Sequence, residues 1–236
     1  MANWPDYALW TDTYIIGSHM MISKPIYRNT GLLTLLLIFF WAATCHAGDQ
    51  VRVQWVADGD TIVLTDGRHV RYIGIDTPEI DSDSRRAQPM GYEARAINRS
   101  LVEGKRLRLT YDEERKDRYG RTLAYVYLPD GTLVNAELVK RGAAFVLYRH
   151  PNTSKARLLL DAQREAMQKG RGIWRWVDRQ ATPVNGFRGN RRSMRFHAHD
   201  CPNAHTISPK NRIHLKNRWE AFWQGYAPAR QCLPFP

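Results

Sequence analysis

Short runs of alternating apolar and polar residues begin at Val51, and this alternation restricts the possible folds more than any other feature of the chain. Val51, Val53 and Trp55 are separated by polar residues, which is the two-residue period of a strand with one buried face. An Asp-Gly pair at 58–59 ends this run, and a second pair at 66–67 is a strong hairpin signal. The pattern therefore predicts a meander of three strands, over 51–55, 61–64 and 69–75.

Two more strands and several helices are expected after the meander. Apolar residues recur at helical spacing in 92–102. They alternate again in 107–111, and 122–128 form a further strand-like run that ends at a Pro-Asp-Gly turn. Helices are predicted at 134–141 and 154–169. This order predicts a mainly β fold with helices (α+β), namely a five-stranded OB-fold barrel with C-terminal helices, a fold whose face commonly binds oligonucleotides.

Acidic residues fall at the ends of the predicted meander strands. Asp60 precedes the second strand and Asp76 follows the third. Ca²⁺ prefers oxygen ligands from carboxylates, backbone carbonyls and water, so these two carboxylates and the Thr77 carbonyl form a candidate metal site. Pro78 stiffens the turn that would aim Glu79 at a water beside the metal, which makes Glu79 the candidate general base.

Two arginines accompany these acids. Arg71 lies in the third predicted strand, and Arg121 follows a Tyr-Gly turn before the fifth. A guanidinium group offers forked donors that suit phosphate oxygens as negative charge builds on them. Each motif alone is typical of an ordinary turn or strand end. Their joint position near strand ends, where one barrel face would gather them, favours a site for phosphodiester hydrolysis.

Taken together, these motifs resemble the staphylococcal nuclease (thermonuclease) family over 51–176. The matching motifs are Asp58-Gly59-Asp60-Thr61, Arg71-Tyr72-Ile73-Gly74-Ile75-Asp76-Thr77-Pro78-Glu79, Asp117-Arg118-Tyr119-Gly120-Arg121-Thr122-Leu123-Ala124-Tyr125, Leu133-Val134-Asn135 and Gly172-Ile173-Trp174. The resemblance implies an OB-fold and a Ca²⁺-dependent hydrolase, a thermonuclease-type endonuclease that cleaves DNA and/or RNA to products ending in 3′-phosphate. It implies Ca²⁺ binding by Asp60, Asp76 and Thr77, and catalysis by Arg71, Glu79 and Arg121.

The resemblance also implies aromatic contacts with the bound nucleotide. Tyr119 and Tyr148 match positions where the family places aromatic side chains. The chain departs at His150, where a second aromatic residue would be expected two residues after Tyr148. An imidazole can stack or contact phosphate, so the departure bears on base preference or affinity rather than on catalysis. The loop at 80–90 is also less lysine-rich than in the type member of the family.

The N-terminal part of the chain is expected to be an export signal. Lys24 and Arg28 precede an apolar run over 32–44, and small residues follow it. These features predict a signal peptide over 20–47, whose apolar region typically spans about 7–15 residues. The alternative is an uncleaved membrane anchor, although a membrane span needs about 20 apolar residues.

Residues 1–19 do not fit ahead of such a signal. Gly17-Ser18-His19-Met20 resembles the remnant of an affinity tag, and a start codon assigned too far upstream would look the same. A bacterial-type signal implies a secreted or periplasmic protein, or a membrane-anchored one facing outward if the signal stays uncleaved.

The charge of the chain favours polyanionic partners. Lys and Arg outnumber Asp and Glu by 35 to 23, which gives a formal net charge of +12. Nucleic acid (DNA and/or RNA) is the first expected partner, and an anionic membrane surface is the second. The sequence implies no stable protein partner, and a monomer is expected.

We expect three parts after the signal. The composition turns basic, glycine-containing and aperiodic after 177, and the remaining C-terminal stretch is too short for a large core without a disulfide or a metal. The predicted parts are a thermonuclease-like domain at 48–177, a basic linker at 178–195 and a small accessory domain at 196–236.

The accessory domain carries the cysteines that would remain in the mature protein, Cys201 and Cys232. A disulfide is the first interpretation, since paired cysteines in exported proteins are commonly oxidised. A Zn²⁺ site that adds His197 or His199 to both cysteines is the second, and unpaired thiols are the third. The segment is weakly similar to the small zinc-binding module of a methylphosphotriester DNA-repair protein.

Two other functions compete with a nuclease. The first is an inactive nuclease-like module that binds nucleic acid or protein at the cell envelope. Loss of a candidate catalytic residue would have favoured it, and none is lost. The second is an envelope scaffold whose basic surface contacts lipid.

Overall fold

The computed structural model describes residues 48–82, 86–181 and 183–233. The expected tag or misassigned start (1–19) and signal peptide (20–47) therefore lie outside the described residues. Among the described residues, no helix is long and apolar enough to cross a membrane.

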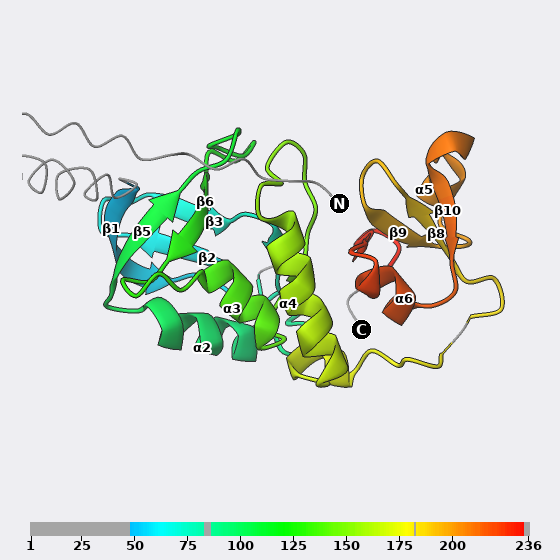
Figure 1. Cartoon of the computed structure of the whole chain (residues 1–236), viewed down its shortest axis with the longest axis horizontal. Helices are drawn as coiled ribbons and strands as arrows, with labels where there is room; N and C mark the ends of the chain where they lie inside the picture. The colour runs from blue at the N-terminus through cyan, green and yellow to red at the C-terminus, as the bar shows by residue number, and fades with distance from the viewer. Residues whose placement is uncertain (1–47, 83–85, 182, 234–236) are drawn as a thin grey trace, which may run out of the picture. The chain divides into compact units, whose positions relative to one another are not determined.

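Five strands close into a barrel in the order β1-β2-β3-β6-β5, which confirms the predicted architecture (Figure 1). Strand β1 pairs antiparallel with both β2 and β5, while β3 pairs parallel with β6. The barrel strands are β1 (Asp49–Val56), β2 (Thr61–Leu64), β3 (His69–Tyr72), β5 (Arg106–Thr110) and β6 (Thr122–Tyr127).

The third predicted strand is divided in two, which differs from the expected single run over 69–75. Gly74 has a φ of +79°, a left-handed conformation that only glycine adopts at little cost, and it interrupts the strand after β3. The chain resumes as β4 (Ile75–Asp76), which pairs with β7 (Phe145–Val146) outside the barrel. This bend brings Asp76 back beside Arg71.

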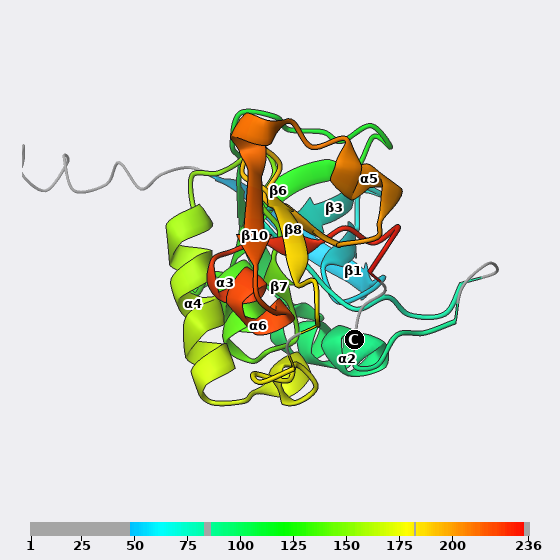
Figure 2. The same ribbon diagram turned by 90° about the vertical axis from the view of Figure 1, so that its right-hand side faces the viewer.

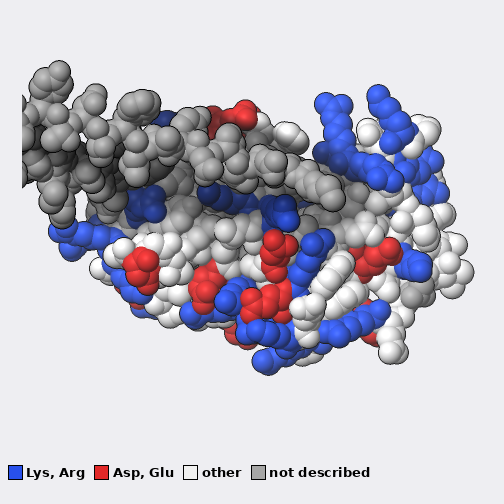
Figure 3. Space-filling model, in the orientation of Figure 1, with Lys and Arg blue, Asp and Glu red and all other residues white. Residues whose placement is uncertain are grey.

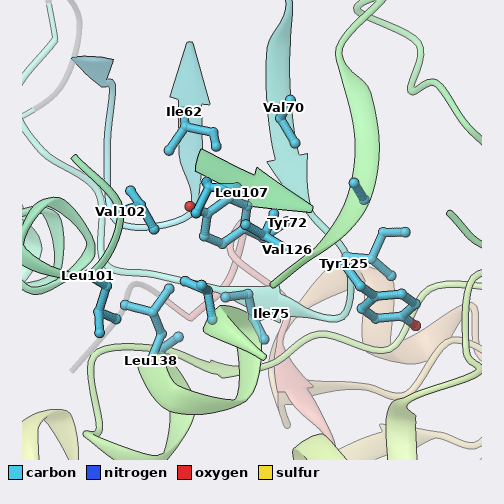
Figure 4. Close-up of a cluster of buried hydrophobic side chains, with 14 of the residues drawn as sticks. Ile62, Val70, Tyr72, Ile75, Leu101, Val102, Leu107, Tyr125, Val126 and Leu138 are labelled. Carbon is cyan, nitrogen blue, oxygen red and sulfur yellow. The ribbon is translucent and has the colours of Figure 1, made fainter. Parts of the chain in front are cut away.

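Three helices pack on the barrel, close to the predicted bounds. They are α2 (Gly91–Val102), α3 (Val134–Lys140) and α4 (Ala156–Gln168). Figure 4 shows apolar side chains from the strands, such as Ile62 and Leu107, meeting those of α2 and α3, such as Leu101 and Leu138. Burial of each such side chain contributes about 1.5–3 kcal/mol, so this core holds the strand ends that carry the candidate site.

The C-terminal segment, residues 187–233, forms a second sheet in the order β10-β8-β9-β11. Its strands are β8 (Phe187–Asn190), β9 (Arg195–Ala198), β10 (Arg212–Leu215) and β11 (Ala227–Pro228), joined by the helices α5 (Pro202–His205), η2 (Pro209–Asn211) and α6 (Arg218–Trp223). Figure 2 views this sheet with the barrel behind it. Strand β8 lies within the stretch expected as a linker. Its Phe187 and Gly189 are buried while Arg188 and Asn190 are partly exposed, a two-residue period too short to stand out in a basic sequence.

The C-terminal segment does not have a core of its own, because it shares one with the nuclease-like part. Helix α4 lies between the barrel and the C-terminal segment (Figure 1), and η1 (Gly172–Arg175) follows it. The Phe222 ring makes edge-to-face contacts with Phe145, Trp174 and Phe196 at centroid distances of 5.6, 5.1 and 5.4 Å. Gln163 of α4 also donates to the Phe222 carbonyl. Residues 48–233 therefore belong to one compact unit.

Candidate active site

Asp60 is the most deeply buried acid of the candidate site. It is 4% exposed, and its Oδ2 accepts a hydrogen bond from the Thr77 backbone N–H at 3.0 Å. Gly59 permits this approach, since a Cβ there would lie 2.7 Å from the Thr77 side chain. Burial raises the pKa of Asp60 well above its ordinary value, and the neighbouring Asp58 and Asp76 raise it further against the effect of Arg71.

Arg71 joins the two predicted metal-binding acids. Its Nη1 lies 2.8 Å from Asp60 Oδ2 and its Nη2 lies 2.8 Å from Asp76 Oδ1. Nη1 also donates to the Ile75 carbonyl at 3.0 Å. Burial alone would lower the pKa of Arg71, but the two carboxylates outweigh it and raise the pKa. The bend at Gly74 thus places three charged groups from strand ends in direct contact.

Glu79 is held at the rim of the same cluster by its backbone. Its N–H donates to Gln88 Oε1 at 2.9 Å, and its carbonyl accepts from the Gln88 N–H at 2.8 Å. The Glu79 side chain is one-third exposed, at 33%. The side chain is therefore partly accessible to solvent while its backbone is fixed, and its Oε1 is paired with Arg230 in this structure.

Arg230, which the sequence analysis did not single out, contacts three of the predicted site residues. Its Nη2 lies 2.6 Å from Asp76 Oδ2 and 3.3 Å from the Thr77 carbonyl, and its Nη1 donates to Glu79 Oε1. One guanidinium reaches all three groups, so the structure brings Asp76, Thr77 and Glu79 to a common point. No periodicity or motif connects position 230 with positions more than 150 residues earlier, and only the fold shows this contact.

Arg121, the second predicted phosphate-binding arginine, is oriented by Asp117. Its Nε and Nη2 lie 2.8 and 2.7 Å from Asp117 Oδ2. Asp117 also accepts the backbone N–H groups of Tyr119 and Arg121. Partial burial raises the pKa of Asp117, but these hydrogen bonds and the Arg121 charge lower it overall, so the carboxylate stays ionised as an anchor.

A cavity of about 360 Å³ adjoins this cluster, and its lining does not include Asp60, Thr77 or Glu79. It is lined by Arg71, Asp76 and Arg121 from the barrel side and by Arg195, Pro228 and Arg230 from the C-terminal segment. Figure 3 shows further Lys and Arg side chains gathered on the C-terminal segment. A cavity with several guanidinium groups beside clustered carboxylates can bind a phosphate and a cation together.

The predicted aromatic contacts lie beside this cavity rather than in its lining. Tyr119 is exposed, and the guanidinium of Arg121 lies 5.6 Å from its ring centroid. Tyr148 and His150 contact each other edge to face at 5.9 Å. Arg149, between them, does line the cavity.

Cys201 and Cys232 are bonded as a disulfide, the first of the three interpretations of this pair. His197 Nδ1 lies 3.6 Å from Cys201 Sγ, and the three side chains could converge on a metal. Zinc binding by cysteine requires thiolates, so the zinc interpretation would require this bond to open.

The chain is similar to known proteins over its barrel and helices. Residues 69–176 match the family model described as "Staphylococcal nuclease homologue". The "Thermonuclease" of Staphylococcus intermedius is 42% identical over 136 residues, which cover 56% of this chain and 80% of that protein. The "Uncharacterized endonuclease" of Escherichia coli O157:H7 is 41% identical over 147 residues, or 61% and 88% of the two chains. "Endonuclease YncB" of Bacillus subtilis is 38% identical over 143 residues, or 56% and 67%. The match to the family model ends before β8.

Proposed function

Because the chain belongs to the staphylococcal nuclease family and is a nuclease of that family, we propose that it is an exported, Ca²⁺-dependent enzyme that cleaves DNA and/or RNA and leaves 3′-phosphate ends. The observation that carries this proposal is the convergence of Asp76, Thr77 and Glu79 on one cationic group, with Arg71 and Arg121 lining the adjoining cavity.

The residues present fit a hard divalent cation. The Arg230 guanidinium lies on the oxygens that a metal would use, so a positive charge is already stabilised there. The donors are carboxylates and a carbonyl, the ligand types that Ca²⁺ takes. Burial is the main cause of the raised pKa of Asp60, and the carboxylates of Asp58 and Asp76 add to it against the opposing charge of Arg71. When bound, Ca²⁺ would neutralise charge on the phosphate and orient its oxygens.

The side chains would then divide the hydrolysis among them. Glu79 accepts a proton from a water molecule while the oxygen of that water forms a bond to phosphorus. Arg71 and Arg121 donate hydrogen bonds to the phosphate oxygens, and these bonds strengthen as negative charge builds on the oxygens. The bond between phosphorus and the 5′-oxygen breaks, the leaving oxygen takes up a proton, and the phosphate stays on the 3′-oxygen.

Metal removal tests this proposal directly. We expect the purified protein to cut single-stranded DNA, duplex DNA or RNA with Ca²⁺ and to lose this activity with a Ca²⁺ chelator, because the clustered carboxylates would then lack their cation. Gel analysis of end-labelled substrate measures cleavage, and removal of the terminal phosphate by a phosphatase before polymerase extension identifies 3′-phosphate ends. Nucleic-acid binding without Ca²⁺-dependent cleavage would instead support an inactive binding module. Vesicle binding alone would support the scaffold.

Export is proposed from the predicted signal peptide and is supported by the Cys201–Cys232 disulfide, a bond that persists in oxidising compartments. Expression of the full chain in a Gram-negative host, followed by fractionation, should place the nuclease in the periplasm or medium. The matched control is a variant that lacks residues 20–47, and it should stay in the cytoplasm. Equal export of both forms would exclude the signal.

A further inference from the structure

The C-terminal segment forms one wall of the catalytic cavity. Strand β11 pairs parallel with β9, with Ala227 opposite Arg195, and the Ala229 N–H donates to the Phe196 carbonyl. The Cys201–Cys232 disulfide ties the chain just after Arg230 back to the same segment. These contacts hold Arg195, the first residue of β9, and Arg230, two residues beyond β11, in the lining of the cavity.

Arg195 carries a buried donor without a partner. Its Nη1 is inaccessible to solvent and makes no hydrogen bond to any residue that the structure describes. Burial lowers the pKa of Arg195, and Arg149 and Arg230 lower it further, although Asp76 opposes them. Buried polar groups are nearly always hydrogen-bonded, and a guanidinium among other cations is stabilised most by an anion.

Arg230 differs from Arg195 because its partners are the residues that would hold a cation. Its ion pairs with Asp76 and Glu79 and its contact with the Thr77 carbonyl use the oxygens assigned to Ca²⁺ binding and to the general base. A cation at these oxygens and the Arg230 guanidinium exclude each other. Displaced Arg230 would still be at the cavity wall, now without an anionic partner.

From these contacts we propose that the C-terminal segment adds a phosphate-binding subsite to the catalytic cavity, for a phosphate of the nucleic acid next to the one that is cleaved. Arg195 is its fixed donor, and Arg230 is a donor that is released when a cation takes its carboxylate partners. The proposal rests on the proposed function, since the subsite serves a cavity that cleaves nucleic acid. It also assigns the segment beyond the matched family region a direct part in substrate binding.

The first test compares Arg195→Gln with Arg192→Gln, a control that removes the same charge from the exposed turn between β8 and β9. With a short single-stranded oligonucleotide, Arg195→Gln should raise KM about tenfold to a hundredfold, the effect of one hydrogen bond to a charged group, while kcat stays close to native. The control should leave both near native. Arg195→Lys keeps the charge and should give an intermediate KM, which separates lost binding from misfolding.

A substrate series then locates the phosphate. Single linkages on either side of the cleaved one are replaced by neutral methylphosphonates. At one position, the neutral linkage should raise the KM of the native protein by about the same factor as the Arg195→Gln substitution does. The same linkage should change the KM of the Arg195→Gln variant little further. The subsite is excluded if Arg195→Gln and Arg192→Gln have the same KM. It is also excluded if the KM of Arg195→Gln responds to each methylphosphonate replacement as that of the native protein does. A protein that cleaves no substrate at all would contradict the proposed function instead.

The second test needs no activity. Calorimetric titration of Ca²⁺ into Arg230→Gln without nucleic acid should show binding about tenfold tighter than in the native protein, because the competing cation is gone. Arg192→Gln should bind Ca²⁺ as the native protein does. Unchanged or weaker Ca²⁺ binding by Arg230→Gln would show that Arg230 does not compete for the site.

Discussion

Glu79→Gln is expected to lower kcat by about a hundredfold to ten-thousandfold, the range for loss of a general base. Glutamine keeps the size of the side chain and can still accept a hydrogen bond from Arg230, so the local structure should survive. The backbone of Glu79 is also held at both N–H and carbonyl by Gln88, which the substitution does not touch. What is lost is the ability to take a proton from water.

Steady-state kinetics on a defined oligonucleotide measure this effect, with Glu93→Gln as the control. Glu93 is an exposed glutamate of α2, outside the cavity lining, and its replacement should leave kcat within about twofold of native, as surface substitutions usually do. Calorimetric Ca²⁺ binding should persist in Glu79→Gln. Near-native kcat in Glu79→Gln would remove Glu79 from the mechanism.

Arg121→Lys is expected to lower kcat by about a hundredfold to a thousandfold, the loss found when one preorganised donor to a developing charge is removed. Lysine keeps the positive charge but not the forked geometry that Asp117 orients with two hydrogen-bond distances of 2.8 and 2.7 Å. Arg121 is a cleaner test than Arg71. Removal of Arg71 would leave Asp60 and Asp76 buried without their shared partner, which typically destabilises a protein by about 3–5 kcal/mol.

The measurement for Arg121→Lys is kcat alongside a thermal unfolding curve. The partly exposed Arg121 side chain contributes little to the core, so the melting temperature should stay close to native. Arg175→Lys, at an exposed arginine outside the cavity, is the matched control and should match native in both quantities. If Arg121→Lys retains native kcat while folded, Arg121 does not stabilise the transition state.

The two predictions above concern residues that could be found from the sequence, because each lies close in sequence to the other residues of its motif. Asp60, Asp76, Thr77 and Glu79 lie at or just beyond strand ends separated by short turns, and short turns keep neighbours in sequence close in space. The Asp-Gly turns and alternating runs therefore predicted the meander and the acids on it. The Asp117-to-Arg121 loop is similarly local, because its hydrogen bonds span four residues.

Other parts of the structure have no such local signal. The division of the third strand depends on the left-handed conformation of Gly74, which a sequence permits but does not require. Strand β8 was expected as linker because four residues are too few to show a period against a basic background. The shared core around Phe222 joins aromatic residues that are far apart in sequence, and nothing in their spacing identifies which of them pack together.

The sequence by itself determined the barrel and the class of chemistry, and it predicted the residues assigned to that chemistry, since all of these depend on periodicity, turns and charges within a few residues of one another. Only the tertiary structure decided that the C-terminal segment lines the cavity that holds the candidate site. Arg230 meets Asp76 across 154 positions of sequence, through a parallel β11–β9 pairing, a shared core and a disulfide. Contacts of that range are selected by packing of the whole unit, because no local pattern fixes which distant surfaces are buried together.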